Sequence, residues 1–192
     1  MLKKLPRSVG RALQGWRAGF DKLACQSEAL AAVPSSLTVT SPAFEDGQPV
    51  PVRYTDDGEK MSPPIAWRGV PEQARSVAIL IEDADSPTPQ PLVHAIIHGL
   101  PGHDGLLTEG ALDHERASRS DAARLGRNSY LMQRYLPPDP PPGHGAHRYV
   151  IQVFAADTEP GFGKAPGRSE LLDWLAAHAL AKGSLVGTYT RR

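Results

Sequence analysis

Three long apolar runs constrain the fold more than any other feature of this chain. Residues 76–81 read SVAILI, residues 92–101 read LVHAIIHGLP, and residues 147–157 read HRYVIQVFAAD. An apolar run without polar alternation is typical of a strand covered on both faces. The 18 glycines and 19 prolines among 192 residues favour turns and short strands over a helical bundle. The sequence therefore predicts a mainly β protein with layers on both sides of its central strands.

Helical patterns lie at the two ends of the chain. Residues 168–183, RSELLDWLAAHALAKG, predict a C-terminal helix with Ser169 as its N-cap and Gly183 just past its end. Residues 1–36 predict a basic amphipathic helical extension, because apolar residues recur there at spacings of three and four. Residues 37–192 then form the main domain.

The extension has two interpretations. Six basic side chains outnumber two acidic ones within residues 1–30. We favour a helix packed on its own domain or on a second copy of the chain. The alternative is peripheral contact of residues 1–30 with an anionic membrane surface.

Ionisable and aromatic side chains gather at the ends of the three strand runs. They are Glu82, Asp83 and Asp85 after the first run, His94 and His98 in the second, and His147 and Tyr149 at the start of the third. Alternation predicts that the two histidines of the second run share a face, as do His147 and Tyr149. A proline-rich loop, residues 137–145, precedes the third run. Taken singly, these features have ordinary explanations as a solvated turn, hydrogen-bonded strand histidines and a structural rim.

Taken in order, these motifs resemble the phosphatidylethanolamine-binding protein family, in its bacterial branch of Raf-kinase-inhibitor-like proteins. The resemblance covers residues 38–190, from SPAFEDGQPVPVRYTDDGEKMSPPIAW through IEDADSP, HAIIHGLPG and the PPDPPPGHGAHRY stretch to HALAKGSLVGTY. It implies an antiparallel β-sandwich of a larger and a smaller sheet with a C-terminal helix. It also implies a small pocket that binds phosphate or a phospholipid headgroup. Some members of the family regulate kinases or proteases, and bacterial members suggest a homodimer.

The family pattern transfers to this chain motif by motif. The ligand-binding residues that it implies are Asp83, Asp85, Pro87, His94, Pro140, Pro141, Gly143, Gly145, His147 and Tyr149. Three departures bear on them: Ala84 and Ala95 replace the family's proline and tryptophan, and Leu136-Pro137-Pro138 replaces a Gly-Gly-Pro stretch. Since proline has no N–H to donate, the last change predicts weaker anion binding or a different ligand.

Acidic groups beside an anion require a compensating positive charge or a shared proton. An aspartate that accepts from a histidine Nδ1–H would keep that ring cationic. We therefore expect His147 or His94 to supply the positive charge.

The remaining features limit the class of protein. A formal net charge of zero argues against a nucleic-acid partner. The single cysteine, Cys25, allows no disulfide within the chain, which indicates a reducing compartment and predicts a cytoplasmic location. We expect neither a cofactor nor an enzymatic activity. The alternative is a metal-assisted hydrolase built from His94, His98, His144 and His147 with Asp83 and Asp85, although no H-E-x-x-H motif is present.

Overall fold

The computed structural model describes residues 6–112 and 124–191 and contains two antiparallel sheets. The larger sheet has the strand order β6-β4-β3-β7-β8 and the smaller one β1-β2-β5. The strands of the larger sheet are β3 (Ser76–Asp83), β4 (Leu92–Pro101), β6 (Arg124–Leu125), β7 (His147–Ala156) and β8 (Ala179–Tyr189). Those of the smaller sheet are β1 (Thr38–Thr40), β2 (Ile65–Arg68) and β5 (Gly105–Leu107), and a 3-10 turn, η5, spans Val52–Tyr54. The expected mainly β sandwich is confirmed.

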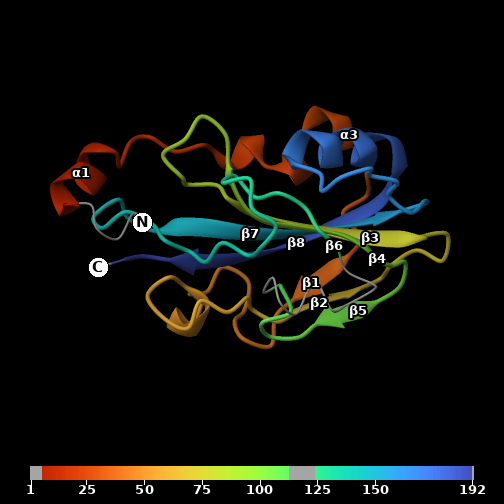
Figure 1. Ribbon diagram of the computed structural model, residues 1–192, viewed down its shortest axis with the longest axis horizontal. Coiled ribbons are helices and arrows are strands. Elements are labelled where there is room, and N and C mark those ends of the chain that lie inside the picture. Colours follow the sequence, from red (N-terminus) through yellow and green to blue (C-terminus); the bar gives the residue numbers. More distant parts are fainter. Residues whose placement is uncertain (1–5, 113–123, 192) are drawn as a thin grey trace.

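The larger sheet is the middle of three layers (Figure 1). The smaller sheet covers one face, while helix α3 (Arg168–His178) and the N-terminal segment cover the other. Ile79, Ile97 and Val153 pack in the core between the sheets, and Leu80 and Phe154 pack in the core beneath α3. Every residue of β3 is buried. This double coverage explains the continuous apolar runs in the sequence.

A β-bulge in β4 changes the faces of its histidines. Ile81 of β3 pairs with Ala95, but the next residue, Glu82, pairs with Val93, so His94 is an extra residue in the ladder. Such a bulge moves the residues beyond it to the opposite face. His94 lines a cavity between the sheets, whereas the His98 ring packs against Phe162 on the α3 side. The prediction that the two histidines share a face is therefore wrong.

The C-terminal helix is present, but its ends differ from those predicted. Gly167 is its N-cap, and the Gly167 N–H donates to a Glu170 carboxylate oxygen at 3.0 Å. The helix ends at His178, and β8 begins at the next residue. Gly183 lies inside β8, where a Cβ would come within 2.2 Å of the Leu37 carbonyl oxygen. Strand pairing with β7 overrides the helical pattern of residues 179–182.

The N-terminal segment contains much less helix than predicted. Helix α1 covers only Arg7–Ala12, and residues 1–5 lie outside the described part of the chain. Three 3-10 turns follow: η2 (Phe20–Lys22), η3 (Ala24–Gln26) and η4 (Glu28–Leu30). Leu23 and Leu30 are fully buried in the core beneath α3. Residues 20–33 thus pack on their own domain, as favoured, but mostly without a helix. Among the described residues no helix has the length and apolarity needed to span a bilayer.

Candidate functional site

The side chains predicted to line a site do converge. Asp83 ends β3, and its backbone partner on β7 is Tyr149, two residues after His147. His147 Nδ1 lies 2.7 Å from Asp83 Oδ2, and the His147 and Tyr149 rings stack with centroids 6.3 Å apart. His94 reaches the same cluster from β4, with its ring edge-on to Tyr149 at 5.1 Å. All four side chains are buried.

His144 extends this cluster toward the N-terminal segment. Its Nδ1 lies 2.7 Å from His147 Nε2, and its Nε2 lies 2.8 Å from the Leu13 carbonyl oxygen. Because a carbonyl only accepts, His144 Nε2 must carry the hydrogen of that bond. Asp83, His147 and His144 therefore form a buried histidine chain that ends at the backbone of Leu13.

Proton counting fixes the charge of the buried histidine chain. Its three hydrogen bonds need three protons, whereas one carboxylate and two neutral imidazoles supply two. With all bonds made, the three side chains carry one added proton and no net charge. Burial, followed by the neighbouring His147, lowers the pKa of His144 and favours its neutral form. With His144 neutral, the added proton lies at the contact between His147 and Asp83.

Asp85 has a different environment from Asp83. Its carboxylate accepts from the Arg148 backbone N–H, from Arg148 Nε at 2.7 Å and Nη2 at 2.8 Å, and from Arg17 Nη1 at 2.9 Å. Burial opposes ionisation of Asp85, but the hydrogen bonds from Arg148 and Arg17 outweigh it and lower the pKa to about 2. Asp85 thus joins three segments of the chain as a permanent anion.

Glu82 points to the opposite face of the sheet. Its carboxylate accepts from the Ala24 backbone N–H, from Gln152 Nε2 and from Arg168 Nε, the last at 2.6 Å. It is fully buried and connects the N-terminal segment and α3 to the sheet. Of the three acids that follow the first apolar run, Asp83 alone contacts the histidines.

A small cavity lies beside the histidines. It has a volume of about 10 Å³, which is space for roughly one water-sized group. Its lining residues are Phe44, Val50, Pro63, Ile81, His94, Tyr135, Pro138, Tyr149 and Ile151. His94 Nε2 and the Tyr149 hydroxyl are buried there without a hydrogen-bond partner among the described residues. Unpaired buried polar atoms are rare in folded proteins and call for a specific explanation.

The protonation states of these two groups follow from burial. His94 Nδ1 lies 2.5 Å from the Leu136 carbonyl oxygen and must donate to it. Burial lowers the pKa of His94, so the ring is neutral and its Nε2 is an acceptor. Burial also raises the pKa of Tyr149 well above its usual value, so its hydroxyl keeps a proton to donate. Of the two expected sources of positive charge, His94 is therefore excluded.

The other predicted site residues frame this cluster without lining the cavity. Pro87 is half-buried in the loop after Asp85, and Pro140 and Pro141 are buried. Gly143 and Gly145 adopt φ values of +83° and +104°, which side chains rarely adopt. Among the departures from the family pattern, Ala95 packs in the core between the sheets, and Pro138 lines the cavity.

Sequence reasoning missed three functional arginines and named His144 only as a candidate metal ligand. Arg17 and Arg148 hold Asp85, and His144 extends the histidine chain. Arg191 fixes the proline-rich loop by contacts with Asp139 and with the Pro140 carbonyl oxygen. The sequence signal for His144 is its place in GHGAH, three residues before His147. Within residues 6–112 and 124–191, no group of three or more His, Cys, Asp or Glu side chains is placed to hold a metal ion.

Comparisons with known proteins agree with the fold and with these motifs. The family model described as "Phosphatidylethanolamine-binding protein" matches residues 40–190. This chain belongs to the phosphatidylethanolamine-binding protein family. The expected resemblance is confirmed, and the segment before residue 40 lies outside the match.

Relatives within the phosphatidylethanolamine-binding protein family come from distant organisms. A UPF0098 protein of Methanothermobacter thermautotrophicus is 33% identical over 155 residues, which are 81% of this chain and 99% of the relative. The crystal structure of a putative family homologue, CT736 from Chlamydia trachomatis, has a TM-score of 0.73 and 30% identity, over 82% of this chain and 99% of that one. E. coli YbcL, with a TM-score of 0.74 and 24% identity over 82% and 100% of the two chains, shares the fold.

Proposed function

We propose that this protein is a non-enzymatic ligand-binding module whose pocket takes a phosphate or a phosphate-bearing headgroup. The observation that carries the proposal is the pair of unpartnered buried groups, His94 Nε2 and the Tyr149 hydroxyl, in one cavity. Beside them lies His147, whose Nδ1 is 2.7 Å from Asp83 Oδ2 in the buried histidine chain. Family membership supports the ligand class, because the family model is named for a phospholipid with a phosphate headgroup.

The two unpartnered groups define what a ligand must offer. Neutral His94 accepts a hydrogen bond, and the Tyr149 hydroxyl donates one. A protonated phosphate oxygen, or a phosphate with an ammonium group attached, supplies both an acceptor and a donor. A cavity of about 10 Å³ admits one such oxygen, so the rest of the ligand would lie outside the cavity.

Removing the Tyr149 hydroxyl should change ligand affinity without changing the stability of the fold. We expect Tyr149→Phe to leave the free energy of unfolding within about 0.5 kcal/mol of wild type, because no hydrogen bond to a described residue is lost. Phosphate affinity should fall by roughly 2- to 13-fold, the equivalent of one hydrogen bond of about 0.5–1.5 kcal/mol. Isothermal titration calorimetry and urea denaturation measure the two effects.

Tyr54→Phe is the matched control. The Tyr54 hydroxyl donates to Glu109 at 2.6 Å and lies outside the cavity lining. This variant should keep phosphate affinity and lose stability. Equal phosphate affinity in Tyr149→Phe and wild type would argue against a ligand contact at the cavity.

The ligand class is tested by a thermal-shift panel of phosphate, phosphoethanolamine, nucleotides and phosphotyrosine. A ligand at 100 times its dissociation constant should stabilise the native protein by about 2.7 kcal/mol. No shift with any member of the panel would contradict the proposed function. Elemental analysis of the purified protein checks the alternative, since a stoichiometric metal would favour the hydrolase.

Sulfate affinity should depend on pH. Sulfate keeps its charge across the neutral pH range, so any change in sulfate affinity must come from a change in the protonation of the protein. We expect weaker binding at about pH 8 than at about pH 6, because loss of the added proton leaves the buried histidine chain negatively charged. Calorimetric titrations at both pH values measure the change, and equal affinities would exclude this mechanism.

Several finer features belong to the same proposal. We infer a cytoplasmic location from the single buried cysteine, Cys25. A homodimer, and a kinase or protease as protein partner, follow only from resemblance to the family. Light scattering on the purified chain tests the dimer.

A further inference from the structure

The N-terminal segment, residues 6–33, divides into two parts with different packing. Residues 20–33 are anchored by apolar side chains such as Leu23 and Leu30 in the core beneath α3. In contrast, residues 6–18, here called the strap, bury only Gly10 and Ala18, while Trp16 is 70% exposed. Gly19, with φ of +108°, joins the two parts. Segments with few buried apolar contacts open at low free-energy cost.

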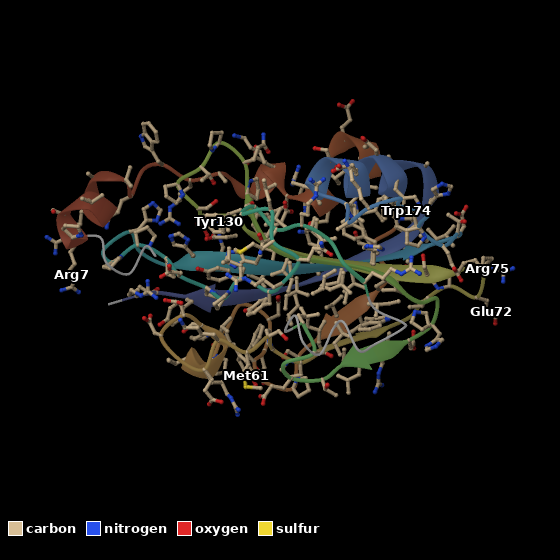
Figure 2. All side chains as sticks on the ribbon, viewed as in Figure 1. Arg7, Met61, Glu72, Arg75, Tyr130 and Trp174 are labelled. Carbon is tan, nitrogen blue, oxygen red and sulfur yellow. The ribbon has the colours of Figure 1, made fainter. Side chains whose placement is uncertain are left out.

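The strap lies against the outer side of the candidate site. Gln14 Nε2 donates to the Gly143 carbonyl oxygen at 2.7 Å, and Arg17 donates to the Ala146 and His144 carbonyl oxygens. The Ala18 N–H bonds to the Ser86 carbonyl oxygen, within the loop that carries Asp85. Figure 1 shows this segment running from α1 along the outside of the larger sheet, and Figure 2 shows Arg7 at the far end of the molecule from Arg75.

The strap also supplies oxygen acceptors to the buried histidine chain. His144 Nε2 lies 2.8 Å from the Leu13 carbonyl oxygen and 3.2 Å from that of Trp16. These oxygens occupy the position that an acceptor oxygen of a ligand would take at the outer end of the chain. With the strap in place, His144 is fully buried and His147 and Asp83 are buried behind it.

We propose that the strap is an intramolecular competitor, so that docking of residues 6–18 and binding of a phosphate-bearing ligand at His144 exclude each other. This inference rests on the proposed function. Displacing the strap exposes His144 Nε2–H as a donor to phosphate and leaves Asp85 paired with Arg148. A protein whose competent state is only partly populated binds with an affinity reduced by that fraction.

Arg17→Ala tests the competition because two explanations of the role of Arg17 predict opposite changes in phosphate affinity. If Arg17 served only as a nearby cation, its loss would weaken phosphate binding. If it holds the strap on Asp85, its loss should tighten phosphate binding, by about tenfold where the docked state dominates. The matched control is Arg11→Ala, the same charge change in the same strap at a side chain for which the described residues show no ion pair. Its phosphate affinity should stay within about twofold of wild type.

A second pair of variants avoids any change of charge. A Cβ on Gly10 would come within 2.0 Å of the Pro142 carbonyl oxygen, whereas one on Gly15 meets nothing within 4 Å. Gly10→Ala should therefore loosen the strap and tighten phosphate binding, and Gly15→Ala should do neither. Hydrogen exchange of residues 6–19 reports strap docking independently of ligand affinity.

The complete experiment measures inorganic phosphate affinity by calorimetry and strap exchange by mass spectrometry in wild type and all four variants. We expect phosphate to accelerate strap exchange in wild type, and Arg17→Ala and Gly10→Ala to bind phosphate more tightly. Faster strap exchange in these variants with unchanged or weaker phosphate affinity would overturn the competition and leave the proposed function standing. No phosphate binding in any variant, even where strap exchange is fast, would overturn both.

Discussion

Replacing Asp83 with alanine is expected to lower the free energy of unfolding by about 3–5 kcal/mol, the usual cost of breaking a buried pair. The carboxylate accepts from His147 Nδ1 at 2.7 Å and from the Asp85 backbone N–H at 2.8 Å. Its removal would leave both His147 Nδ1 and the Asp85 backbone N–H buried without their hydrogen-bond partner. Urea denaturation at neutral pH measures the loss.

Asp157→Ala is the control for this prediction. Asp157 makes a similar contact with His178, at 2.9 Å, but the two side chains are 49% and 37% exposed. Solvent screening limits such a pair to about 1 kcal/mol or less. If Asp83→Ala cost no more than this control, the buried histidine chain would not hold the site together as described.

The second large effect is expected in the N-terminal segment. Leu23→Ala should cost about 2–5 kcal/mol, since Leu23 is fully buried with Leu171 and Leu175 of α3. This residue lies outside the part of the chain that matches the family model. A loss of this size would show that residues 20–33 belong to the core of the domain.

Leu106→Ala provides the comparison, because the Leu106 side chain is 56% exposed on β5. We expect its effect to stay within about 0.5 kcal/mol. Chemical denaturation of both variants under one condition measures the difference. Equal and small losses would indicate that the N-terminal segment is an appendage, as the sequence first suggested.

The N-terminal segment shows how tertiary contacts can override a helical pattern in the sequence. Of the apolar residues before residue 24, Leu23 is fully buried, but it lies between two 3-10 turns and not in a continuous helix, while Trp16 is 70% exposed. The chain there follows the surface of the sheet, with the Ala18 and Gly19 N–H groups bonded to the loop after β3. Tertiary hydrogen bonds replaced the local ones that a helix would have made.

The histidines illustrate the same limit at the site. Alternation placed His147 and Tyr149 on one face correctly, because β7 runs without a break through both. It failed for His94 and His98, because a bulge at His94 shifts the register between β3 and β4. A bulge arises from the pairing of two strands, so the periodicity of one strand cannot predict it.

The sequence by itself determined the buried central strands and the order of motifs that brings Asp83, His147 and Tyr149 together. A strand buried on both faces needs apolar residues at nearly every position. Such strands can therefore be recognised from the local sequence alone. Only the tertiary structure decided that His144 extends the chain, that Arg17 holds Asp85, and that residues 6–18 cover the site. His144 and His147 are only three residues apart, but the other contacts join distant positions, for example Arg17 and Ala146 at a separation of 129. Many of them end on backbone carbonyl oxygens, which every residue carries, so the amino-acid pattern gives no sign of them.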